Sequence, residues 1–447
     1  MILKIRTILL VLPFVFGLNL AKGQNSDSFS LEQAIQYAMK HSYVLQNTSN
    51  EVEKAQKKVW ETITTGLPQV SGSANYNAFL ELPVMLVPGE YFGGEKGTYI
   101  SIKSGQDFNS DFGLSVSQLI FDGSYIVGVS SSQIYLNLAK QSHEKTQIDI
   151  REAVTQAYYM ALISNRNMVI MKENLENEEN IYNETKILYE NGFREEQDVE
   201  QIDLLLRNAK NAMLKAEREL KIAKVVLKFA MGYEMNNNIV LTDQLERFIA
   251  PLVQKQNTIN FNFKEHIDYQ ISATNLQVSE KLLKLQKAAY LPQLSGFYSY
   301  TKSAYGKDFN LWKSSTKWYP SSIVGLKLSM NIFSSGMKRA KVQQAKIDLE
   351  SAQNQQRLTE TTLEKEYLTA VANMENALES YQNNNANRDL AEKIKTKTKI
   401  KFDNGIVSST ELAQIETQYL NAYQALVASM LQLLQADINL KKAIGKL

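Results

Sequence analysis

Two long stretches of the chain carry apolar side chains at a helical period and almost no helix-breaking residues. The first runs from Gly123 to Glu190 and contains one further glycine, Gly128, while the second runs from Gly336 to residue 401 with no further glycine and no proline. Because these two residue types are the main helix breakers, each stretch predicts a single very long helix. At 1.5 Å per residue, the first helix would be roughly 100 Å long.

Each long helix is followed by an Asn-Gly break and by a second helical run, at residues 195–232 and 408–445. Apolar side chains recur every seven residues, a period typical of the seam between helices in a left-handed coiled coil. The stripe that follows the first break and the stripe that follows the second are separated by the same number of residues as Gly192 and Gly405, which indicates an internal duplication. The stripes are Val199, Leu206, Met213, Leu220 and Leu227; Leu412, Tyr419, Leu426, Leu433 and Leu440; and, in the first long helix, Val154, Ala161, Met168, Leu175, Tyr182 and Tyr189.

In four stretches of about ten residues, apolar and other side chains alternate with a period of two residues instead of the helical period, which predicts four β-strands. A capping box at Ser30 opens the helix before the first strand, and this helix is expected to run to about Thr64. Because Phe121 and Phe333 adjoin the long helices, each second strand is expected to continue into its helix without a linker. The strands lie near residues 70–80, 111–121, 294–302 and 322–333, two in each copy of the repeat.

The pattern divides the chain into a signal peptide, two structural repeats and a connector. Residues 1–23 carry basic residues before an apolar run too short to span a bilayer, which predicts a cleaved secretory signal. The repeats occupy residues 24–232 and 263–447, and each holds a helix, two strands, a long helix and a further helix. The Asn-rich connector, residues 233–262, is expected on the flank of the helical bundle.

One face of each predicted strand is apolar and the other is small or polar, as in a transmembrane β-barrel. Four strands cannot close into a barrel, and an open sheet in lipid would leave the N–H and C=O groups of its edges unpaired. The chain is therefore expected to associate with other copies. Three copies would supply twelve strands, enough for a water-filled bore, although two or four copies satisfy the same argument. The fold class is thus mixed α and membrane β.

Charge and composition exclude several classes of function. Charged residues make up 21% of the chain and the net charge is +2, so no basic field points to nucleic acid. Cysteine is absent, which removes disulfides, zinc thiolates and an acylated cysteine anchor. The histidines, His41, His143 and His266, lack partners at ligand spacing, and no nucleotide-binding or nucleophile motif occurs. We therefore expect no metal, no cofactor and no enzymatic activity.

The order of the motifs resembles that of the TolC-type outer-membrane efflux channels, over the whole chain after Gln24. The resemblance implies a homotrimer in the outer membrane of a Gram-negative cell, with a twelve-stranded barrel and a periplasmic α-barrel of long antiparallel coiled-coil helices. It also implies passive export of small molecules such as drugs and detergents, driven by an inner-membrane transporter and reached through a periplasmic adaptor. The motifs are Ser30-Leu31-Glu32-Gln33-Ala34, the joints Leu67-Pro68-Gln69 and Leu291-Pro292-Gln293, Ile120-Phe121-Asp122-Gly123 with its counterpart Ile332-Phe333-Ser334-Ser335-Gly336, and the Asn-Gly turns followed by Asp198-Val199 and Glu411-Leu412.

The resemblance places the pore aperture at Asp198 and Glu411, with Gln414 one turn further on. The family often has a second acid at the Gln414 position and a basic residue at the Val407 position, and both are missing here. Arg194, in the first turn, is a candidate substitute for the basic residue. The competing interpretation is that acids at a helix start simply favour the positive end of the helix dipole, by about 0.3–1 kcal/mol each.

The resemblance also makes the two inter-helix turns candidate docking tips for the adaptor. Ordinary turn chemistry is a sufficient reason for Asn-Gly between two helices, and both interpretations can hold together. The turn residues are Asn191, Gly192 and Phe193 in the first repeat and Asn404, Gly405 and Ile406 in the second.

Two other functions remain open from the sequence. The same architecture is compatible with type I protein secretion or metal-ion export, because the pore-lining chemistry does not identify the cargo. A soluble periplasmic coiled-coil adaptor or scaffold would share the long helices, but it would not need four strands with lipid-like faces at matching places in both repeats.

Overall fold

A computed structural model describes residues 27–254 and 261–447 of the chain. The predicted signal peptide lies outside the described residues. Contacts divide the fold into two compact units, and each unit draws on both sequence repeats. The helical unit contains residues 27–42, 150–254 and 377–435, and the sheet unit contains residues 43–149, 261–376 and 436–447.

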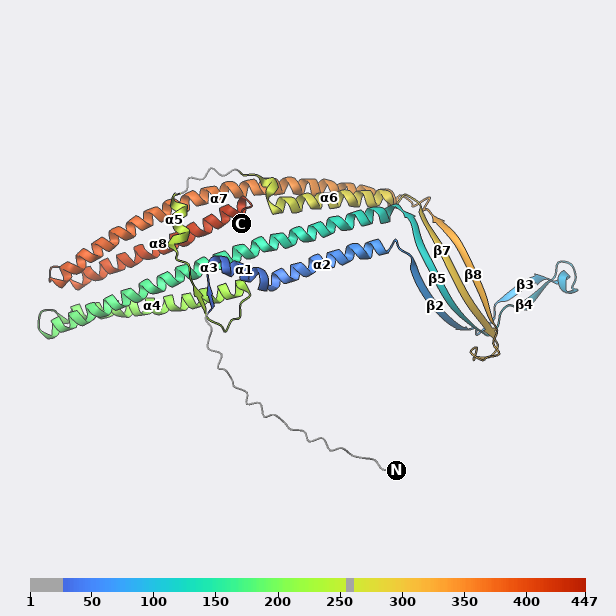
Figure 1. Ribbon diagram of the computed structural model, residues 1–447, viewed down its shortest axis with the longest axis horizontal. Coiled ribbons are helices and arrows are strands. Elements are labelled where there is room, and N and C mark those ends of the chain that lie inside the picture. The colour runs from blue at the N-terminus through green and yellow to red at the C-terminus, as the bar shows by residue number, and fades with distance from the viewer. Residues whose placement is uncertain (1–26, 255–260) are drawn as a thin grey trace, which may run out of the picture. The chain divides into compact units, whose positions relative to one another are not determined.

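The sheet unit is built on four long strands, close to the four that the period-two pattern predicts. They are β2 (Gln69–Ala78), β5 (Phe108–Asp122), β7 (Gln293–Gly306) and β8 (Trp318–Ser329). They form one antiparallel sheet in the order β2-β5-β7-β8 (Figure 1). The register runs across it from Ser73 to Gly113, Thr301 and Ser321. β2 and β8 are the two edges of this sheet.

The two faces of the sheet differ in polarity, as the alternation of side chains predicts. On the apolar face, Val324, Leu326 and Leu328 are 80%, 72% and 70% exposed in the single chain. All ten residues of β2 are exposed as well. An uncovered apolar face of this kind marks a surface that meets lipid or another protein.

The first strand-to-helix junction is direct. β5 ends at Asp122 and α3 (Gly123–Glu190) begins at the next residue. The carboxylate of Asp122 caps the helix, because its Oδ1 accepts from the N–H of Ser124 at 2.7 Å and from that of Tyr125 at 3.2 Å. The last residue of the strand is thus also the cap of the helix.

The second junction differs from the prediction. β8 ends at Ser329 and α7 (Met337–Asp403) begins after an irregular segment, so the direct junction expected at Phe333 is wrong. Ser335 and Gly336 have positive φ angles of 48° and 83°, a conformation that cannot continue a right-handed helix. Helix formation therefore starts only after this turn.

The first predicted helix is in fact two helices, α1 (Leu31–His41) and α2 (Tyr43–Thr64). Ser42 separates them with an extended backbone, at φ −63° and ψ 121°. The C-terminal end of α4 (Glu196–Met231) packs against this break. A Cβ on Gly232 would lie 2.9 Å from the carbonyl oxygen of His41, so the close approach requires glycine.

In the helical unit, α3 is followed by α4 (Glu196–Met231) and α7 by α8 (Ser409–Ala443). The buried seam of α4 is wider than the predicted stripe. Leu220 and Leu227 of that stripe are buried and its other members are half-buried, while an adjoining seven-residue stripe is buried throughout. The adjoining stripe consists of Ile202, Ala209, Ala216 and Ala223.

The connector forms secondary structure that the sequence does not predict. β6 (Ile239–Leu241) pairs in parallel with β1 (Asp27–Phe29), and α5 (Glu246–Gln254) follows. The hydroxyl of Tyr158, on α3, lies 2.9 Å from the carbonyl oxygen of Phe29 and 3.0 Å from Asp243 Oδ2. Burial raises the pKa of Tyr158 well above its usual value. The hydroxyl of Tyr158 thus links β1 and the connector to α3.

A second unpredicted element is a hairpin of β3 (Val84–Pro88) and β4 (Tyr99–Lys103), inserted between β2 and β5. The equivalent segment of the second repeat, residues 307–317, is shorter and contains no strand.

Among the helices of the described residues, none combines the length and the apolar character needed to cross a membrane.

Candidate functional site

The two Asn-Gly turns lie at the same end of the helical unit, where α3 meets α4 and α7 meets α8 (Figure 1). Both turns close in the same way. Gly192 and Gly405 have φ angles of +77° and +72°, and the side-chain amides of Asn191 and Asn404 each donate to a carbonyl oxygen at 2.7 Å. The local sequence therefore fixes the turns, because an Asn-Gly pair tolerates the left-handed conformation that they need. Phe193 and Ile406, at 77% and 70% exposure, project from these ends.

The predicted aperture residues lie on the first turns of α4 and α8. Asp198 completes a capping box, since its Oδ2 accepts from the backbone N–H of Glu195 at 3.4 Å. Glu411 is exposed, and its backbone N–H donates to Ser408 Oγ at 3.2 Å. Gln414 is exposed one turn further along. The side chain of Asp198 thus has a capping role that Glu411 and Gln414 lack.

An apolar cluster joins the two helix pairs just inside the turns. It consists of Ile181, Ile202, Phe402 and Leu412, one residue from each of α3, α4, α7 and α8. Arg194 reaches this cluster from the first turn, because its guanidinium donates to the carbonyl oxygen of Phe402 and lies over the ring at 4.2 Å from the centroid. Arg194 therefore binds the first tip to the end of α7.

A buried ionisable layer lies one to two turns behind this cluster, and the sequence patterns did not single it out. Glu178 on α3 and Glu416 on α8 are 2% and 1% exposed, and Lys395 on α7 contributes the only ammonium within ion-pair distance of Glu416 among the described residues. Its Nζ lies 2.7 Å from Glu416 Oε2 and 4.6 Å from the ring centroid of Tyr419. We name Glu178, Lys395 and Glu416 the charged layer.

The charged layer interrupts positions that would otherwise be apolar. Glu178 lies seven residues after the buried Met171, and Glu416 lies seven residues before the buried Tyr423. A seven-residue column through Met171 predicts an apolar residue at position 178. An acidic residue in a buried column is the sequence signal that could have found this site, but it becomes visible only when the correct column is known.

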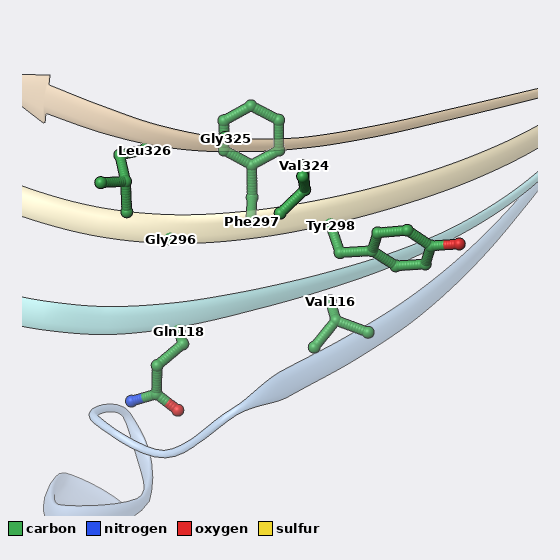
Figure 2. Close-up of a pocket in the computed structure, with 8 residues that line it drawn as sticks. All are labelled: Val116, Gln118, Gly296, Phe297, Tyr298, Val324, Gly325 and Leu326. Carbon is green, nitrogen blue, oxygen red and sulfur yellow. The ribbon is translucent and has the colours of Figure 1, made fainter.

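The sheet carries a different kind of candidate, an apolar hollow of about 490 Å³. Figure 2 shows that its lining comes from three neighbouring strands, with Val116 on β5, Tyr298 on β7 and Leu326 on β8. Gly296 lacks a side chain that would enter the hollow beside Leu326, where a Cβ would lie 3.6 Å from a methyl carbon of Leu326. On the opposite face of the sheet, the ring of Phe297 covers Gly325, where a Cβ would lie 2.8 Å from the ring. The hollow contains no converging polar or titratable groups that would indicate catalysis.

Over residues 27–254 and 261–447, no three His, Asp or Glu side chains gather as ligands for a metal ion. The two candidate regions are therefore a helical end with exposed turns and acids, backed by a charged layer, and a sheet with free edges and an exposed apolar face.

The chain belongs to the outer membrane efflux protein family, whose model matches residues 34–233 and 265–446. The two matched segments follow the two repeats. The protein is thus an outer-membrane efflux channel of the TolC type, located in the outer membrane of Gram-negative bacteria, and it transports rather than catalyses. A comparison of its sequence with curated proteins finds no match.

Solved structures with the same fold include the CmeC outer membrane channel of Campylobacter jejuni, which is 18% identical with a TM-score of 0.72 over 93% of this chain and 85% of that chain. The open-state MtrE outer membrane channel of Neisseria gonorrhoeae is 14% identical, with a TM-score of 0.72 over 93% and 88% of the two chains. The outer membrane protein VceC of Vibrio cholerae is 15% identical, with a TM-score of 0.70 over 93% and 96%.

Proposed function

We propose that three copies of this chain assemble into one channel, in which twelve strands close a transmembrane β-barrel and the long helices form a periplasmic tunnel. The observation that carries the proposal is the four-stranded sheet with two free edges and an exposed apolar face. In lipid, unpaired backbone groups at β2 and β8 would be costly, and pairing of β2 with β8 of a neighbouring copy removes both edges.

The channel acts as a passive conduit for small molecules such as drugs and detergents. The driving energy comes from an inner-membrane transporter, joined to the channel by a periplasmic adaptor; in keeping with this, the sequence contains no nucleotide-binding motif. The exposed turns, with Phe193 and Ile406 at their tips, form the docking surface for the adaptor. Asp198, Glu411 and Gln414 line the aperture beside them, where Glu411 supplies the free negative charge.

Engineered disulfides test the assembly, because the chain has no cysteine of its own. A cysteine at Ser73 in β2 is combined in turn with one at Ser321, Ile323 or Gly325 in β8, on the same face of the sheet. Within one chain β5 and β7 separate these strands by roughly 14 Å at about 4.8 Å per strand, too far for a disulfide. A covalent trimer on a denaturing gel is therefore expected for at least one pair.

The single-cysteine variants are the controls and should remain monomeric on the same gel. Absence of any covalent oligomer at all three registers, together with a monomeric mass in detergent, would contradict the trimer.

Export is tested by deleting the gene and measuring sensitivity to drugs, bile salts and metal salts, with wild-type complementation. Greater sensitivity to drugs and bile salts is expected. Sensitivity to metal salts alone would instead identify metal-ion export, and loss of a secreted protein without any sensitivity would identify protein secretion.

The aperture is tested by charge reversal in planar bilayers. Glu411→Lys should weaken block by divalent cations and shift selectivity towards anions, because the acid is exposed at a helix start. Asp198→Lys should change selectivity less and lower stability, since Asp198 caps its own helix. Unchanged cation block in Glu411→Lys would remove Glu411 from the pore.

A further inference from the structure

The charged layer contains two carboxylates and one ammonium inside the helical unit. Glu178 and Glu416 come from different helices and both are almost fully buried, while the side chain of Lys395 is 17% exposed. Apolar clusters lie on both sides of the layer along the bundle, one around Ile181 and Leu412 and the other around Met171 and Tyr423. Water therefore has little access to these groups.

The charges and hydrogen bonds of the layer do not balance when both glutamates are ionised. The ammonium of Lys395 pairs with Glu416, although neither oxygen of that carboxylate receives an aligned hydrogen bond among the described residues. Glu178 Oε2 has no hydrogen-bond partner there, and neither does Oδ1 of the buried Asn174, one turn earlier on α3. A buried carboxylate oxygen without a partner is costly, and a proton is the smallest group that removes the cost.

Other charged groups near Glu178 do not remove this imbalance. α7 contributes Lys395 and also Lys399, whose ammonium lies 3.2 Å from Asp403 and 3.9 Å from Glu184. α8 contributes the like charge of Glu416, α4 contributes apolar Ile202 and Leu205 to the adjoining cluster, and α3 itself contributes the amide of Asn177. Burial first, and the charge of Glu416 second, raise the pKa of Glu178 to about 7, against the opposing effect of Lys395.

We propose that Glu178 is a proton-binding site of the helical bundle, and that release of its proton loosens the contact between α3 and the α7–α8 pair. With the proton present, the layer is neutral, and the O–H of Glu178 supplies a donor next to the unpartnered Asn174. Without it, two buried carboxylates share one ammonium. The proposal rests on the proposed function only in that this contact lies directly behind the turns where the channel meets its adaptor.

The direction of the pH effect follows from the raised pKa. A folded-state pKa near 7, against about 4.5 unfolded, means that the folded bundle binds this proton roughly 300-fold more tightly. The stabilisation is complete below about pH 4.5 and is lost as the pH rises towards and through 7. The bundle should therefore be tighter in mildly acidic than in mildly alkaline surroundings.

Infrared difference spectroscopy of the purified protein tests the site directly. A protonated buried carboxyl should give a carbonyl stretching band that titrates near pH 7. Glu178→Gln should remove this band, whereas Glu179→Gln, at an exposed neighbouring position on α3, should keep it. A band that titrates between pH 4 and 5, or one that persists in Glu178→Gln, overturns the proposal. Loss of the band on addition of magnesium overturns it too, because a metal ion would then be the natural occupant.

Hydrogen exchange of residues 171–185 and 412–423 tests the mechanical consequence. In the wild type, exchange should accelerate between pH 6 and pH 8 beyond the intrinsic effect of hydroxide, and Glu178→Gln should abolish that excess. An equal excess in both proteins contradicts the proposal. Conductance in planar bilayers reports on the channel independently. A channel that conducts but shows no excess hydrogen exchange would therefore contradict only the proton-binding site.

Discussion

Glu416 and Asp203 hold equivalent positions in the two repeats when Gly405 is aligned with Gly192, yet their surroundings are opposite. The side chain of Glu416 is 1% exposed and pairs with Lys395 on another helix, while that of Asp203 is 35% exposed and pairs with Arg207 on its own helix. Duplication has therefore preserved an acidic residue at this position but not its burial or its ion-pair partner. Neighbouring helices decide whether the same charge is a solvated surface group or part of a buried layer.

The other members of the charged layer have lost their counterparts altogether. The position equivalent to Glu178 holds Ala391, and the position equivalent to Lys395 holds Tyr182. The layer thus occurs once in each chain, which gives the two otherwise similar helix pairs different sensitivities to charge. The predictions below address this difference, beginning with the largest expected effect.

Replacing the basic residue of each pair should give the largest difference in stability between the two sites. Lys395→Met leaves two buried carboxylates without an ammonium, and we expect it to lower the free energy of unfolding by about 3–5 kcal/mol. Arg207→Met, the matched change beside Asp203, breaks a pair whose arginine is 73% exposed and should cost below about 1 kcal/mol. Denaturant titration of both variants in detergent measures the difference. Equal losses would show that burial does not make the layer more dependent on its ammonium than the exposed pair is on its guanidinium.

A second asymmetry concerns the long helices. Tyr158 on α3 contacts Phe29 and Asp243, and the equivalent position on α7 is Val371. Tyr158→Phe removes one donor from each acceptor, while the N–H of Thr242 still donates to Phe29 and the N–H of Leu31 to Asp243, so the change should cost about 0.5–1.5 kcal/mol. Faster hydrogen exchange in β1 and β6 would locate the effect.

The specific control is the exchange rate in the β2–β5 pair, which Tyr158 does not contact. If hydrogen exchange accelerated equally in the β2–β5 pair and in β1, the stabilising effect of the hydroxyl would not be local to β1 and the connector.

The turns should behave alike, because their backbones are alike. Gly192→Ala and Gly405→Ala each place a Cβ on a left-handed residue and should each cost about 1 kcal/mol. Thermal midpoints of the two variants in the same detergent test this equality. A loss confined to one of them would mean that one turn can relax and the other cannot.

The smallest expected effect is at the tip contact of Arg194, whose equivalent in the second repeat is Val407. Arg194→Ala removes the contact with the ring and carbonyl of Phe402 and should cost about 0.5–1 kcal/mol. Exchange of residues 187–196 should accelerate, with less change at residues 400–409 in Val407→Ala. Arg194→Lys should restore the contact only in part, since lysine cannot stack its head group as a plane.

The sequence by itself determined the long helices, the four alternating strands, the two turns and the duplication. These features are local. The absence of helix breakers, the period of apolar positions and the Asn-Gly pairs act through neighbours a few residues away, so one chain read in order contains them. The same reasoning identified the family, because its motifs are these junctions and turns in a fixed order.

Only the tertiary structure decided where the helices break and which buried charges meet. The interruption at Ser42 reflects the close approach of Gly232, and the charged layer joins Glu178, Lys395 and Glu416 from three helices. Such partners lie far apart in sequence, and no periodicity relates them. Burial and pairing are properties of the packed bundle, because the energy of a charge depends on what surrounds it in space rather than along the chain.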